Sequence, residues 1–124
     1  MAWQKSPPEL IEFFDKVTAG LPGQRKSMFG YPVYFADNSQ MFVGLFEDSL
    51  WVRVSEADRA ELLATVPGAA LFEPMAGRPM REYVVLPPAV LRDEAVFERW
   101  LQRALEYTRS LPVKEAKPRK PKKA

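Results

Sequence analysis

The stretch that decides the fold is residues 26–54, which read KSMFGYPVYFADNSQMFVGLFEDSLWVRV. Its apolar residues recur at the period-two spacing of β-strands. Turn-forming segments break this pattern at residues 30–32, 37–39 and 47–49. The pattern predicts antiparallel strands near residues 33–36, 41–46 and 50–54, preceded by a short extended stretch at 26–29. The middle strand, MFVGLF, is apolar at successive positions, so we expect both faces of the sheet to be at least partly covered there.

Three helices are predicted outside this stretch, from the helical spacing of apolar residues and from capping sequences. The first spans residues 7–19, where Ser6 followed three positions later by Glu9 has the pattern of a capping box. The second begins at Ser55, which precedes an acidic first turn. The third runs over residues 93–110, with a long apolar stripe on one face.

A second hairpin is predicted between the last two helices, at residues 70–74 and 81–86, and Pro87-Pro88 is expected to close it. The predicted order is therefore α-β-β-β-α-β-β-α. This order is typical of an α+β fold with an antiparallel sheet of about five strands flanked by helices. The predicted core includes Phe13, Phe14, Phe42, Leu62, Phe97, Trp100 and Leu101.

Length and composition narrow the function. A chain of 124 residues suits one domain, which we expect to span residues 1–112. The chain contains no cysteine and no histidine, which excludes disulfides, zinc sites of the Cys/His kind, thiol nucleophiles and triads with an imidazole base. It also lacks a glycine-rich phosphate-binding motif. We therefore expect a protein that is not an enzyme and that uses no cofactor or metal.

The N-terminal residues contain no apolar signal-peptide core. The longest apolar run, at residues 41–46, is far shorter than the roughly 20 residues that span a bilayer. We expect a soluble protein with no membrane partner. The lack of cysteine fits a reducing compartment, so the expected location is cytoplasmic.

Basic residues concentrate in residues 114–124, KEAKPRKPKKA. Six basic residues against one acid give this segment a net charge of +5, so the rest of the +2 chain carries −3. With two prolines and no large apolar side chain, residues 113–124 are expected to form a disordered basic tail. The tail could contact nucleic-acid phosphates, weakly and without sequence preference, through Lys117, Arg119, Lys120, Lys122 and Lys123. The alternative is a solubilising end without a partner.

Side-chain alternation in the strands predicts one mixed aromatic and basic surface. If Val33, Leu50 and Val84 face the helices, their neighbours in sequence point the other way. The predicted surface consists of Tyr34, Trp51, Arg53, Arg81 and Tyr83. Aromatic and arginine side chains are enriched in protein interfaces and in platforms that stack single-stranded nucleic acid. A protein interface, a nucleic-acid platform, and a face covered by the chain's own elements all remain open.

An ordered series of short motifs carries a family resemblance. The motifs include Met28-Phe29-Gly30-Tyr31, Leu50-Trp51-Val52-Arg53-Val54, Phe72-Glu73-Pro74-Met75 and Gly77-Arg78-Pro79-Met80. Over about residues 25–110, the chain resembles the N-terminal domain of the TfoX/Sxy family. The resemblance implies an α+β fold similar to that of secretion chaperones, and it transfers no catalytic residue.

The name-giving members of that family are bacterial regulators of natural competence that act with the cyclic AMP receptor protein at promoters. The resemblance therefore implies a non-enzymatic protein-interaction domain in transcriptional regulation, which binds a protein partner or a second copy of itself. The alternative function is a nucleic-acid-associated protein that uses its Lys/Arg-rich tail.

Deleting residues 114–124 tests the nucleic-acid alternative. If the tail binds phosphates, the truncated protein should lose its affinity for DNA or RNA, because the remaining domain carries a net charge of −3 and repels polyanions. Fluorescence anisotropy with a labelled oligonucleotide at low salt measures this loss. Undiminished binding would place the site on the folded body instead.

Overall fold

The computed structural model describes residues 4–28, 30–75 and 77–112, with the backbone alone at residues 74, 75, 78, 79 and 81. The helices of this part of the chain are α1 (Pro8–Thr18), α2 (Glu56–Thr65), α3 (Pro88–Arg92) and α4 (Glu94–Arg109). The strands are β1 (Gln24–Met28), β2 (Tyr31–Phe35), β3 (Met41–Phe46), β4 (Ser49–Arg53), β5 (Ala70–Met75) and β6 (Arg78–Leu86).

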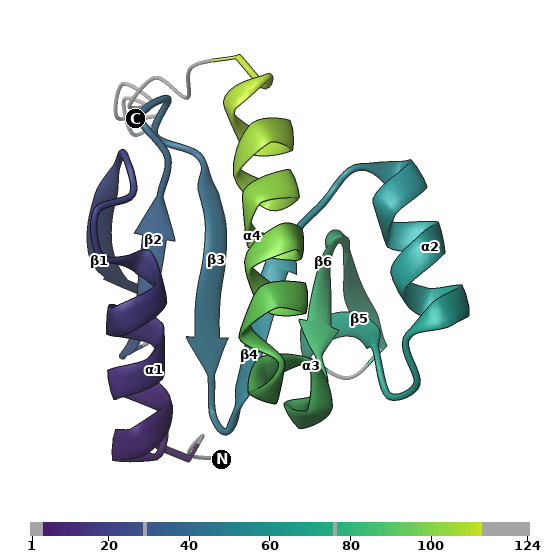
Figure 1. The fold of residues 1–124 in the computed structure, drawn as a ribbon, viewed down its shortest axis with the longest axis horizontal. Coiled ribbons are helices and arrows are strands. Elements are labelled where there is room, and N and C mark those ends of the chain that lie inside the picture. Colours follow the sequence, from purple (N-terminus) through teal and green to yellow (C-terminus); the bar gives the residue numbers. More distant parts are fainter. Residues whose placement is uncertain (1–3, 29, 76, 113–124) are drawn as a thin grey trace, which may run out of the picture.

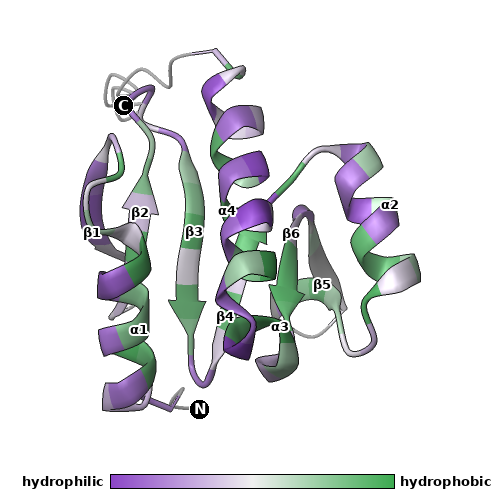
Figure 2. Cartoon of the chain, viewed as in Figure 1, coloured by the Kyte–Doolittle hydropathy of each residue, from purple (hydrophilic) through white to green (hydrophobic). Residues whose placement is uncertain are grey.

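These six strands form one antiparallel sheet in the order β1-β2-β3-β4-β6-β5 (Figure 1). The predicted α+β architecture is confirmed, and the sheet has one strand more than the five expected. The additional strand is β1, which pairs with β2 from Gln24 opposite Phe35 to Met28 opposite Tyr31. Figure 2 shows β1 as hydrophilic and β3 as hydrophobic along most of its length. Because β1 lacks apolar alternation, its sequence predicted only an extended stretch.

The start of α1 differs from the predicted capping box. Pro7 is the N-cap residue and no side chain caps the helix. The Ser6 hydroxyl is buried, and no described residue hydrogen-bonds to it. Prolines at positions 7 and 8 supply the helix start instead, because their fixed φ suits the first turn.

The short helix α3 was not predicted. Pro87 and Pro88 were expected to close the second hairpin, yet Pro88 opens α3 directly after β6 ends. Proline is tolerated in the first turn of a helix, where its missing N–H has no intrahelical acceptor. The predicted cap of α2 does form, because the Ser55 hydroxyl accepts from the Asp58 amide. In α4 the Asp93 carboxylate accepts from the Val96 amide in the same way.

The helices cover one face of the sheet. In Figure 1, α1 and α4 run across it, and the main core lies between them and the strands. The buried residues of this core include Phe14, Phe42, Leu62, Phe97, Trp100 and Leu101, as predicted. Phe13 is the exception, because it is only half-buried, with its ring centre 5.3 Å from that of Phe97. Full burial of one such side chain contributes about 1.5–3 kcal/mol.

A polar clasp joins the C-terminal end of α4 to the turn between β2 and β3. The Asn38 side-chain amide donates to the carbonyls of Thr108 and Leu111, at 2.7 and 3.1 Å. Gln40 Nε2 donates to the carbonyl of Pro112 at 3.0 Å. The Thr108 carbonyl also accepts from the Leu111 amide at 3.1 Å, so Asn38 adds a second bond there and pairs the carbonyl of Leu111 just beyond the helix.

The opposite face of the sheet carries a second, smaller apolar cluster. Its buried members are Val33, Trp51, Phe72 and Tyr83. Among the described residues, every side chain of this cluster comes from a strand, and those of the helices join the main core instead. We call this side of the sheet the open face.

Trp51 is the centre of the open-face cluster, and Gly44 makes room for it. The two residues are cross-strand partners on β4 and β3. A Cβ atom added at Gly44 would stand 2.5 Å from Trp51 Cζ2 and 3.0 Å from Val33 Cγ2. A glycine in the interior of a strand often marks such a close approach. Only glycine at this position lets the indole lie against the backbone of β3.

Replacing Gly44 by alanine should lower the free energy of unfolding by about 1–3 kcal/mol, because the added methyl group overpacks the site. Urea unfolding followed by circular dichroism measures the change. In a Trp51→Phe background the same substitution should cost less, because the indole atoms that it meets are absent. An equal cost in both backgrounds would show that the indole does not require Gly44.

Candidate protein interface on the open face

Strand register decides which side chains share the open face. Gly44 lies opposite both Val33 and Trp51, and Arg53 lies opposite Tyr83. Directly paired residues project to the same side of a sheet. The structure therefore places Trp51, Arg53 and Tyr83 on one face, as alternation predicted, and it adds Val33 to that face rather than to the helix side.

Trp51 is fully buried by its own chain. Its ring stacks on Phe72 at 5.6 Å and 21°, and it meets the edge of Tyr83 at 5.1 Å and 89°. Trp51 Nε1 is buried without a hydrogen-bond partner among the described residues. Such an orphan donor costs about 1–3 kcal/mol, which the aromatic packing offsets. Trp51 supports the open face from beneath and is not itself accessible to a partner.

Tyr34 was predicted on this surface and lies on the other side of the sheet. Its hydroxyl donates to the carbonyl of Leu21 at 3.0 Å, and its ring meets Phe42 of the main core at 5.9 Å and 78°. The prediction failed because it assumed that Val33 faces the helices. Gly44 pairs with both Val33 and Trp51, so Val33 lies on the same face as Trp51. The next residue, Tyr34, therefore points to the helix side.

Arg53 is held in a polar network at one end of the sheet. Arg53 Nε donates to Glu82 Oε1 at 2.8 Å, and a second guanidinium nitrogen donates to Gln40 Oε1 at 3.0 Å. The guanidinium carbon lies 5.4 Å from the ring centre of Tyr83. Tyr107 of α4 also donates to Glu82 Oε1, at 3.2 Å. With its side chain 13% exposed and its charge balanced by Glu82, Arg53 ties the open face to α4.

The remaining predicted site residues lie outside what the structure describes. Arg81 belongs to β6, but its side chain is not among the described ones. The tail residues Lys117, Arg119, Lys120, Lys122 and Lys123 fall beyond residue 112. Their proposed contacts with a partner or with nucleic acid therefore stay predictions.

The accessible residues of the open face on its first three strands form a group that the sequence did not single out: Lys26, Met28, Phe35 and Met41, which we call the β1–β3 patch. Met28, Phe35 and Met41 are half-buried, while Lys26 is exposed with its ammonium 5.2 Å from the centre of the Phe35 ring. Phe35 lies opposite Met41 because a bulge follows Tyr34. An uninterrupted alternation pattern cannot show this offset, which is why the sequence missed the pair.

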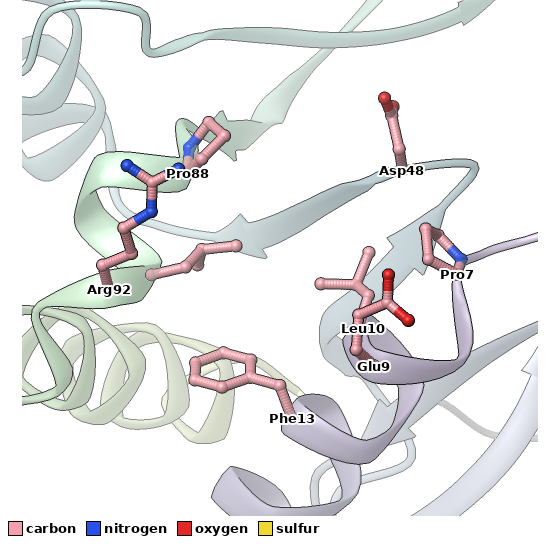
Figure 3. Close-up of a pocket in the computed structure, with 8 residues that line it drawn as sticks. Pro7, Glu9, Leu10, Phe13, Asp48, Pro88 and Arg92 are labelled. Atoms are coloured by element: carbon pink, nitrogen blue, oxygen red, sulfur yellow. The ribbon is translucent and has the colours of Figure 1, made fainter.

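A separate cavity of about 340 Å³ opens on the helix side. Figure 3 shows Arg92 and Pro88 on one side of it, Pro7, Glu9, Leu10 and Asp48 on the other, and Phe13 below. Each lining side chain is exposed or half-buried, and the charged ones are all exposed. The cavity thus offers an apolar floor with charges at its rim and no buried polar group to orient a ligand.

Two further observations concern the described residues as a whole. They contain no group of three or more acidic side chains placed to hold a metal ion. No helix within the described ranges has the length and apolarity needed to cross a bilayer.

Comparison with known protein families decides the relationship. The family model of the TfoX N-terminal domain matches residues 17–108, from the last two residues of α1 almost to the end of α4. The chain belongs to this family. No curated protein matches the sequence. Membership in the TfoX N-terminal domain family confirms the resemblance seen in the sequence. The matched residues include all six strands of the sheet, and with them the open face.

Tyr83 provides a spectroscopic probe of the open face. Burial raises the pKa of its phenol above the ordinary value of 10.0, while the nearby Arg53 opposes the rise. Because the folded state holds this proton more tightly than the unfolded chain, the stabilising contribution is complete below pH 10 and is lost as the pH rises through the native pKa. We expect the free energy of unfolding to fall above pH 10, and to fall less steeply in Tyr83→Phe.

Titration of phenolate absorbance checks the assignment. Burial also raises the pKa of Tyr31 and Tyr107, so the Tyr83→Phe variant should lose one of several components that ionise above the ordinary tyrosine range. Identical alkaline titrations for the wild type and Tyr83→Phe would contradict it.

Proposed function

We propose that this member of the TfoX N-terminal domain family is a non-enzymatic protein-interaction domain that acts in transcriptional regulation in the bacterial cytoplasm. It binds its protein partner through the open face of the sheet. Family membership supports the regulatory part of the proposal, and the geometry of the β1–β3 patch supports the binding part.

One observation carries the binding part. Within the described chain, all helix side chains that join an apolar cluster pack on the main core, so Met28, Phe35 and Met41 stay half-buried on a face without a helix. Aromatic residues and methionine are enriched in protein interfaces. Methionine also adapts its shape to different partners, because its side chain is unbranched and polarizable.

The open face consists of two layers of residues, one buried and one accessible. Trp51, Phe72 and Tyr83 pack together beneath the surface and join β4, β5 and β6 through their rings. The β1–β3 patch presents the side chains that a partner can reach. A rigid base beneath adaptable contact residues reduces the ordering cost that association must overcome.

Capture of a partner from the native host, with variants of the patch, tests the proposal. Phe35→Ser and Met41→Ser should each weaken capture more than tenfold, because truncating a central anchor of an interface costs about 2 kcal/mol or more. Leu63→Ser is the matched control, since Leu63 is 41% exposed on α2, outside the open face. It should leave capture unchanged.

Thermal unfolding of each variant accompanies the capture experiment, so that loss of binding is compared among folded proteins. If folded Phe35→Ser and Met41→Ser retain every partner that the wild type captures, the β1–β3 patch is not the interface. Loss of the same partners with Leu63→Ser would move the interface to the helix side.

A further inference from the structure

We infer that the partner segment bound by the β1–β3 patch is an acidic stretch of a protein that carries large apolar side chains. This inference rests on the proposed function and specifies the chemistry of its partner. It is drawn from the distribution of charge around the patch.

The open face is basic where it is charged. The described strand positions that register and packing bring to it include Gln24, Lys26, Met28, Val33, Phe35, Met41, Gly44, Phe46, Ser49, Trp51, Arg53, Phe72, Met80, Tyr83 and Val85, and none of these is acidic. Arg53 is balanced by Glu82, whereas Lys26 makes no ion pair with any described residue. The neighbouring Arg25 of β1 is bound to Asp15 of α1 at 2.8 Å, so its charge is satisfied on the helix side.

The position of Lys26 links the apolar and the charged parts of recognition. Its ammonium lies over the ring of Phe35, so a partner that buries Phe35 also takes Lys26 out of water. An unpaired buried cation is costly, and a carboxylate placed beside it recovers the cost and adds a charge-assisted hydrogen bond. A basic residue at the same place would meet like charge. Apolar anchors flanked by acidic residues satisfy both requirements.

Two other occupants fit the patch less well. A second copy bound by the same face would bring its own Lys26 into an interface where the strand positions named above offer no acid, because a two-fold interface uses one patch twice. A nucleic acid carries a phosphate at every nucleotide, whereas Lys26 is the one cation among the four residues of the patch, so the patch suits a short acidic stretch better than a polyanion. Both remain as outcomes of the test.

A displayed library of random sixteen-residue peptides, selected on the immobilised full chain, supplies the probe. Enriched peptides should combine Asp or Glu with Phe, Leu, Met or Trp. Fluorescence anisotropy of the enriched peptides should show at least tenfold weaker binding to Lys26→Glu and to Met41→Ser. Arg92→Glu is the matched charge control, because Arg92 is exposed, makes no ion pair with a described residue and lies on the helix side. It should bind the peptides as the wild type does.

The outcomes separate this inference from the proposed function. Enriched peptides that are apolar but not acidic, and that lose binding only with Met41→Ser, would overturn the acidic partner and leave the interface in place. Peptides that bind Met41→Ser as well as the wild type would overturn both. A dimer in sedimentation that Met41→Ser dissolves, or an oligothymidine that Lys26→Glu alone releases, would assign the patch to a second copy or to nucleic acid.

Discussion

The contact between Trp51 and Gly44 is the constraint on which the open face depends. An indole needs more area than one strand provides, and the missing side chain at position 44 lets it spread across β3. Phe72 and Tyr83 then enclose it from the side of β5 and β6. The sheet thereby gains a buried apolar centre on the face that no described helix covers. This second core holds β5 and β6 to the meander, since both of its outer rings come from them.

The elements with strong periodicity were predictable, and the errors fall where local geometry overrides pattern. Long apolar stripes identified α1 and α4, and alternation identified β3 and β4. β1 carries no such signal, because its residues are polar and become a strand only by pairing with β2. The open-face assignment was correct for Trp51, Arg53 and Tyr83 and wrong for Tyr34, since register through Gly44 fixes the orientation of β2. Side-chain alternation within one strand does not show which residues of the neighbouring strand lie opposite it.

The exposed chemistry of the interface was harder to foresee than its core. Trp51 attracts attention in the sequence, and it is the residue that a partner cannot reach. Phe35 and Met41 become neighbours only because a bulge shifts β2 against β3. Bulges re-aim side chains at functional surfaces, and they are set by pairing rather than by composition. In this domain, Trp51, Phe72 and Tyr83 form the base, and Phe35 lies in the outer layer together with two methionines and Lys26.

The polar clasp formed by Asn38 and Gln40 has a consequence for how the domain resists force. The amide of a turn residue grips the end of α4 at two carbonyls, and Gln40 holds the carbonyl of Pro112 just beyond them. The chain therefore leaves the domain from a tethered point beside the turn between β2 and β3. A force that pulls on the residues after Pro112 would therefore have to break these hydrogen bonds before it could separate α4 from the sheet.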